Sequence, residues 1–274
     1  MKKILLTIVL FCAFCFFNQQ SKAQSVSVSP SRLYYKVGLG EYKSKKITVT
    51  NKGKIKQSFQ IKFADFESPG KLGKTRLLKP GESEHSCAKW LSASPSFFEL
   101  GPGETKNVEV LLQIPNIPEA NKVKWAVMMI KLAKEKKVPD NLDNKTMGMG
   151  IISTFQFAIH IFQTPPSVIF KKAEILSFKE ITTDKDSVRI LALLIVNTGE
   201  DIVDCASYLE LTNLENGETK RLKIKGFTVL PGGSREVYFK LPLNLSKGNY
   251  SVLGVVDYGS REEIQAAELN IEIK

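Results

Sequence analysis

The amino-acid sequence predicts an all-β protein made of two immunoglobulin-like β-sandwich domains in tandem. Three observations support this prediction: apolar residues alternate with polar ones over short segments, turn residues recur between these segments, and the second half repeats the scheme of the first. Alternation with a period of two is typical of strands with one buried face, and regularly spaced turns are typical of a sandwich.

Four segments of the first half show the alternation clearly. In QSFQIKFADF, for example, Phe59, Ile61 and Phe63 share one face and polar side chains occupy the other. Turn sequences such as VGLGE, NKGK and LGPGE separate the segments. The half is lengthened by an insertion over residues 67–92. The strands predicted here span residues 45–51, 57–66, 107–115 and 123–133.

The second half repeats this order of signals. In both halves an apolar strand ends in Asn-x-Gly, and a later Pro-Gly turn precedes a strand that ends in Ile-Pro or Leu-Pro. Tyr250 stands where such folds place a corner tyrosine whose hydroxyl bonds back to the main chain; an ordinary buried tyrosine is the alternative. The strands predicted here span residues 189–200, 229–242, 248–259 and 264–274.

The chain begins with the features of a secretory signal peptide, which we place at residues 1–23. MKK is followed by a 14-residue apolar run, shorter than the roughly 20 residues that a membrane-spanning helix needs. An uncleaved anchor is the alternative. The prolines of QTPPS cannot donate to a strand ladder and predict a domain boundary. We therefore expect a first immunoglobulin-like domain over residues 24–164, a second sandwich over residues 165–274, and no integral membrane span in either.

Charge and cysteine content limit the possible partners. Residues 24–165 hold 22 Lys and Arg against 12 Asp and Glu, a net charge of +10, whereas residues 166–274 hold 14 against 16. A basic half attracts acidic chains or anionic surfaces. The favoured alternative is that its lysines, such as Lys43 and Lys45, are outward positions on strands. Cys87 and Cys205 are expected in different domains as buried or isolated thiols, and a disulfide across the domain interface is the alternative.

Motifs for catalysis are missing from the sequence. Its two histidines, His85 and His160, form no His-x-x-x-His pair, and neither a Gly-x-Ser-x-Gly motif nor a phosphate-binding glycine loop occurs. Cys87, near His85 and Glu84, raises the possibility of a metal site, but a polar surface loop is the default reading. The sequence therefore predicts neither an enzyme nor a protein that binds a cofactor, a metal or nucleic acid.

Residues 26 to about 165 resemble the PapD-like periplasmic chaperones of pilus assembly. The resemblance is carried by VSVSPSRLYYKVG, ITVTN, FFELGPGETKNVEV and the final STFQFAIHIFQTPP. It implies a periplasmic chaperone that binds exported surface, pilus-type or secretion-system subunits by β-strand addition. In that mode the last strand of the first domain completes a subunit that lacks one strand.

The resemblance also implies site residues. A donor strand should be apolar on the side that leaves its own core and should follow a polar loop. The expected donor residues share one alternating phase and are Met147, Met149, Ile151, Phe155 and Phe157. A fully buried strand after a long hairpin loop is the alternative.

The family anchors the C-terminal carboxylate of its client between an arginine and a lysine. Arg32 in SPSRLYY matches the arginine, whereas His160 stands where the family has the lysine. This departure leaves the anchor weakened, repurposed or lost. The second hypothesis for the whole chain is a structural adaptor of a cell-surface or secretion complex that docks through its basic first domain.

Overall fold

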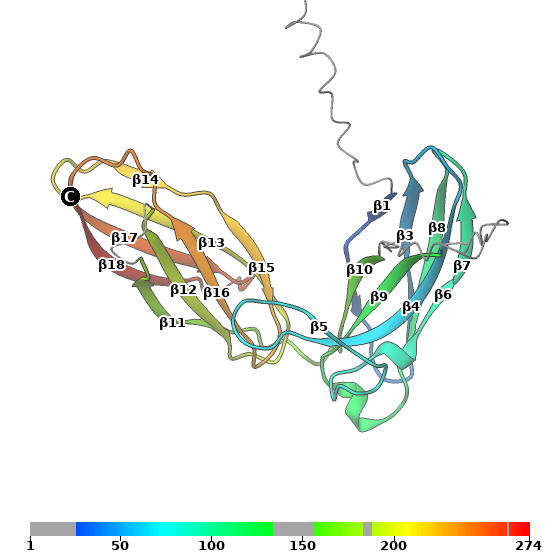
Figure 1. Cartoon of the computed structure of the whole chain (residues 1–274). Helices are drawn as coiled ribbons and strands as arrows, with labels where there is room; N and C mark the ends of the chain where they lie inside the picture. Colours follow the sequence, from blue (N-terminus) through cyan, green and yellow to red (C-terminus); the bar gives the residue numbers. More distant parts are fainter. Residues whose placement is uncertain (1–25, 134–155, 183–187, 262) are drawn as a thin grey trace, which may run out of the picture.

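The computed structural model describes residues 26–133, 156–182, 188–261 and 263–274. The expected signal peptide lies outside these residues. The described part of the chain forms 18 strands and two short 3-10 helices, η1 (Ala88–Trp90) and η2 (Pro118–Asn121), and its four sheets make two sandwiches (Figure 1). The predicted all-β fold of two immunoglobulin-like sandwiches is confirmed. Within the described ranges, no helix has the length and apolarity needed to cross a membrane.

The first sandwich packs two sheets face to face. One sheet has the order β1-β3-β8-β6, and the other has the order β2-β10-β9-β4-β5 with β7 also paired to β4. Strands β2 and β10 run parallel to each other. The strands are β1 (Val26–Ser29), β2 (Arg32–Lys36), β3 (Tyr42–Asn51), β4 (Gln57–Glu67), β5 (Arg76–Leu78), β6 (Leu91–Ser94), β7 (Phe97–Leu100), β8 (Thr105–Gln113), β9 (Lys124–Ala133) and β10 (Gln156–Thr164).

The second sandwich repeats the design with fewer strands. Its smaller sheet has the order β11-β12-β16, and its larger sheet has the order β14-β13-β17-β18 with β15 also paired to β13. The strands are β11 (Ala173–Glu180), β12 (Ile190–Asn197), β13 (Val203–Asn213), β14 (Thr219–Arg221), β15 (Lys225–Val229), β16 (Ser234–Lys240), β17 (Gly248–Asp257) and β18 (Gln265–Ile273).

The opening segment of the first sandwich is shared between its two sheets. β1 pairs with β3 in one sheet, whereas β2 pairs with β10 in the other. Pro30 lies between them, and because proline has no N–H to donate, it suits the point where one ladder ends and the next begins. The crossover brings Arg32 directly beside His160, its register partner on β10.

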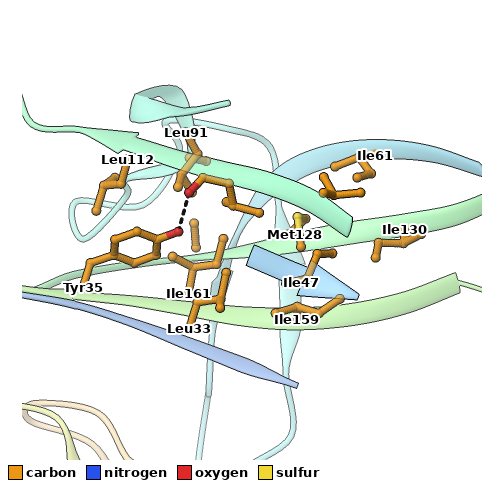
Figure 2. Close-up of a cluster of buried hydrophobic side chains, with 14 of the residues drawn as sticks. Leu33, Tyr35, Ile47, Ile61, Leu91, Leu112, Met128, Ile130, Ile159 and Ile161 are labelled. Carbon is orange, nitrogen blue, oxygen red and sulfur yellow. Dashed lines mark hydrogen bonds between the residues drawn. The ribbon is translucent and has the colours of Figure 1, made fainter. Parts of the chain in front are cut away.

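Alternating residues of the two sheets fill the first core. Figure 2 shows part of it, where Leu33, Ile47 and Ile161 are buried with their neighbours. Tyr35 lies in the same core, and its hydroxyl donates a 2.7 Å hydrogen bond to the carbonyl oxygen of Val110 on the opposite sheet. The sandwich is therefore stabilised by apolar packing and by a side-chain hydrogen bond between β2 and β8.

The repeated Asn-x-Gly motif has the same structural role in both halves. The buried Asn51 side chain donates to the carbonyl of Leu100 and accepts from the main-chain N–H of Gly53. The buried Asn197 amide donates equivalently to the carbonyl of Val229, near the end of β15. Each asparagine thus ties the end of one strand to the turn before the Pro-Gly strand.

Three other predictions are settled by the structure. The Tyr250 hydroxyl donates a 3.0 Å hydrogen bond to the carbonyl of Ser246, so the corner tyrosine is confirmed. Cys87 and Cys205 are both buried and free, one in each sandwich, which confirms isolated thiols. Lysines of the first half, Lys43 among them, lie mostly on exposed positions, as the favoured alternative predicted.

A third apolar cluster joins the two sandwiches. Trp125, Val127 and Phe162 of the first sandwich pack in it with Ile202 of the second. Because β9 also contributes the neighbouring side chains Ala126, Met128 and Ile130 to the first core, this strand is buried on both faces. The connection between the sandwiches is therefore a packed interface.

Candidate functional site

Strand β10 is paired over different lengths on its two sides. On one side the strand pairs with β9 from Gln156 to Gln163. On the other side it pairs with β2 only from His160 to Thr164. Over Gln156–Ile159, that second side has no partner strand among the described residues. Among the described residues, β10 therefore begins with an open strand edge.

The side chains of β10 alternate between inside and outside. Ile159 and Ile161 are buried in the first core and Phe157 packs against it, whereas Gln156 and Ala158 are exposed. The sequence placed Phe157 on a phase that turns away from its own core; at this residue the side chain instead contacts that core. The other expected donor residues, Met147, Met149, Ile151 and Phe155, lie outside the described residues.

Arg32 and Tyr34 of β2 reach across to the second sandwich. The Tyr34 hydroxyl donates a 2.7 Å hydrogen bond to Asp204, and Arg32 Nη1 lies 3.5 Å from the other carboxylate oxygen of Asp204. Burial, followed by the hydrogen bond to Asp204, raises the pKa of Tyr34 to about 12, so the phenol keeps its proton. The arginine and its partner are exposed, and exposed ion pairs of this kind contribute at most about 1 kcal/mol. The contact between Arg32 and Asp204 therefore adds little to the stability of the packed sandwiches.

His160 lies among aromatic rings next to Arg32. Its ring meets Phe66 edge-on at 4.8 Å between centroids and lies parallel to Phe162 at 6.2 Å. Burial lowers the pKa of His160, and the positive charge of Arg32 lowers it further. The imidazole is therefore neutral at neutral pH and adds no positive charge beside Arg32.

A cleft between the sandwiches brings these groups together. Its cavity of about 190 Å³ is lined by Arg32, His160 and Phe162 from the first sandwich and by Phe227 and Arg235 from the second. The structure thus places the two predicted anchor residues in one cavity. It adds Arg235, which the sequence reading missed because its strand belongs to the other half and no local motif marks it.

The insertion over residues 67–92 closes one side of this cleft. Figure 1 shows this segment, which includes β5, reaching from the first sandwich to the second. The main-chain N–H of Glu236 donates a 2.7 Å hydrogen bond to the carbonyl of Lys71, and the two side chains form an ion pair at 3.4 Å. The returning part of the insertion is held by the buried carboxylate of Asp65, which accepts from the N–H groups of Gly81 and Ser83.

Of the residues considered for a metal site, His85 and Glu84 approach each other, with 3.4 Å between Nε2 and Oε1. His85 stacks on Trp125 at 4.1 Å between ring centroids, Cys87 is fully buried, and the Glu84 side chain is 88% exposed. Burial raises the pKa of the Cys87 thiol, which opposes the thiolate that a metal would need. No group of three or more potential metal ligands occurs within the described parts of the chain.

Comparisons with known proteins return solved structures alone, since neither a family model nor a curated protein matches the chain. The crystal structure of the E. coli chaperone DraB is 15% identical, covers 89% of this chain and 96% of its own, and has a TM-score of 0.44. A structure of Salmonella enterica SafA pilin in complex with the SafB chaperone matches at 13% identity, covering 91% and 98%, with a TM-score of 0.43.

Solved periplasmic and pilus chaperones, the proteins that the sequence resembles, are thus similar to this chain over most of its length. At identities below 25% and TM-scores below 0.5, the likeness does not determine what this chain binds. The function has to be argued from the open edge of β10 and the cleft beside it.

Proposed function

We propose that the protein is a periplasmic chaperone that binds exported surface, pilus-type or secretion-system subunits by β-strand addition along β10. The observation that carries the proposal is the open edge at Gln156–Ile159, where β10 has a partner on one side alone among the described residues. An extended segment of another chain can pair with such an edge through main-chain hydrogen bonds.

The hydrogen bonds between β10 and β2 show which way the unpaired main-chain groups at the beginning of β10 point. The N–H of His160 donates toward β2, to the carbonyl of Ser31. Because main-chain groups alternate sides along a strand, the N–H groups of Gln156 and Ala158 point the same way, beyond the end of β2. They offer donors for an added strand. We further propose that Met147, Met149, Ile151 and Phe155, which precede this edge, supply apolar side chains to the groove of the client.

The arginine at the end of the open edge suits the end of a bound chain. Arg32 is the register partner of His160, the residue at which the edge closes. A client strand that runs along Gln156–Ile159 would bring its terminus to this point. We propose that Arg32 anchors its carboxylate and that the neutral His160 contributes at most a hydrogen bond.

A proline at the open edge tests the proposal. Ala158→Pro removes an N–H that faces the free side and leaves the bonds to β9 in place, since proline is tolerated on the outer side of an edge strand. The probe is a synthetic ten-residue peptide of alternating Val and Thr, followed by fluorescence anisotropy. We expect Ala158→Pro to weaken binding about tenfold or more, a loss equivalent to about 1.4 kcal/mol.

The matched control is Ala158→Ser, which keeps the N–H and should bind like the unmodified protein. Both variants should unfold in urea like the parent. Equal binding by Ala158→Pro and Ala158→Ser, or failure of the parent protein to bind alternating peptides at all, would contradict strand addition at this edge.

The second candidate function, a structural adaptor, is favoured by the net charge of +10 on residues 24–165. Docking through exposed lysines should weaken sharply as the salt concentration rises, because salt screens exposed charges. Binding through apolar side chains that fill a groove should change little with the salt concentration. A titration of peptide binding between about 50 and 500 mM salt separates the two functions. The screening length falls severalfold over this range.

A further inference from the structure

Arg235 of β16 lines the same cavity as Arg32 but comes from the other sandwich. It is half-buried, and the described residues provide its guanidinium with neither an ion pair nor a hydrogen bond. The neighbouring carboxylate of Glu236 is already engaged by Lys71 and by the hydroxyl of Tyr238. A half-buried cation without an anion is unusual, because buried charges are normally paired.

The rest of the cavity does not supply the missing anion. Asp204, which lies next to Arg32, accepts hydrogen bonds from Tyr34 and from the hydroxyl of Thr228. His160 provides no negative charge. The remaining lining carries no charge and consists of hydroxyl groups, aromatic rings such as Phe66 and Phe227, Leu230 and two glycines. Two arginines therefore face a cavity that can accept an anionic group with a small apolar neighbour.

The insertion holds Arg235 in this position. Gly73 lies against the arginine so closely that a Cβ atom added at this glycine would coincide with the guanidinium. Its backbone has φ of +63°, a conformation that favours glycine in its own right. Since Lys71 is also bonded to Glu236, the residue after Arg235, the insertion fixes both the strand and the side chain.

We infer that Arg235 is the second cation of the anchor and that it binds, together with Arg32, the C-terminal carboxylate of the client chain. The inference rests on the proposed function and replaces His160 as the partner of Arg32. Guanidinium groups present forked donors that match the two oxygens of a carboxylate. The insertion, which also lines the cavity through Ser68 and Thr75, then sets the place of Arg235.

The test compares two forms of the alternating Val-Thr peptide, one with a free C-terminal carboxylate and one with a carboxamide. We expect the unmodified protein to bind the acid form about tenfold more tightly. Arg235→Gln should reduce this preference severalfold and leave the affinity for the carboxamide unchanged. Lys240→Gln, an exposed residue of the same strand, is the charge control and should keep the preference.

Two glycine variants test the positioning role. Gly73→Ala should displace the guanidinium and reduce the preference for the acid form. Gly70→Ala is the matched control, because Gly70 has a similar φ of +67° but no atom within 4 Å of an added Cβ. It carries the same backbone strain without the displacement, so it should keep the preference. Arg235→Gln still decides the question if Gly73→Ala does not fold.

The outcomes separate the inference from the proposed function. If both peptide forms bind equally to the unmodified protein, or if Arg235→Gln keeps the preference for the acid, the inference is overturned while strand addition stands. If neither peptide binds, the proposed function fails and the anchor fails with it.

Discussion

At the scale of single residues, buried asparagines define the turns of both sandwiches. The Asn51 amide donates to the carbonyls of Ile55, Leu100 and Gly101, so Asn51→Ala leaves several buried groups without a partner. We expect it to lower the free energy of unfolding of the first sandwich by about 2–3 kcal/mol.

Tryptophan fluorescence during urea unfolding measures this change selectively. Trp90 and Trp125 are the two tryptophans of the sequence, and both belong to the first sandwich. Asn197→Ala, the equivalent change in the second sandwich, is the control and should shift the far-UV circular dichroism transition instead. An unchanged fluorescence midpoint for Asn51→Ala would show that the turn forms without this side chain.

Some residue roles could be predicted from the sequence and others could not. Tyr250 was predicted because its bond to Ser246 is local and its place in the repeat is distinctive. Arg235 was missed because its neighbour Gly73 lies in the other half of the chain, and Asp65 was missed because its partners Gly81 and Ser83 follow 16 and 18 residues later, where no spacing rule connects them. Local chemistry is visible in a single sequence, whereas contacts between the halves are not.

At the scale of the element, β2 is the strand that connects the core to the cleft. Its Tyr35 hydroxyl bonds to Val110 across the first sandwich, as the dashed line in Figure 2 shows. Tyr35→Phe keeps the ring and removes this bond, so we expect a loss of about 1–2 kcal/mol in the free energy of unfolding.

The same urea experiment followed by fluorescence tests the role of Tyr35. Tyr42→Phe is the matched control, because the Tyr42 side chain is 74% exposed and its hydroxyl should contribute little. Equal stability of the two variants would mean that apolar packing alone holds β2 against the opposite sheet.

Strand positions were predicted well because the pattern of period two is a direct consequence of one buried face. The predicted segment 57–66, for instance, is β4 at Gln57–Glu67. Two features of the elements escaped this reasoning. The opening segment VSVSPSRLYYKVG is divided between two sheets, and β9 is buried on both faces because the second sandwich covers its outer side. Both depend on tertiary packing, which the alternation does not encode.

At the scale of the whole molecule, the contacts between the sandwiches hold the candidate anchor together. Arg32 and Arg235 come from different sandwiches, so their common cavity exists only while the two stay packed. Hydrogen bonds reinforce the packing. The Thr164 hydroxyl, for example, donates a 2.8 Å hydrogen bond to the carboxylate of Asp201. The binding site proposed here is thus a property of the interface.

Ile202→Asp tests this dependence on the interface. Ile202 is 6% exposed and packs in the apolar cluster with Phe162 and Trp125. Because a carboxylate cannot be buried there without a partner, the cluster should open instead. We expect a larger radius of gyration in small-angle X-ray scattering, a red shift of Trp125 emission and loss of the preference for the free peptide carboxylate. The control is Ile224→Asp, at a residue that is 54% exposed, and it should change none of these properties. If Ile202→Asp also leaves them unchanged, the sandwiches are held together by their polar contacts.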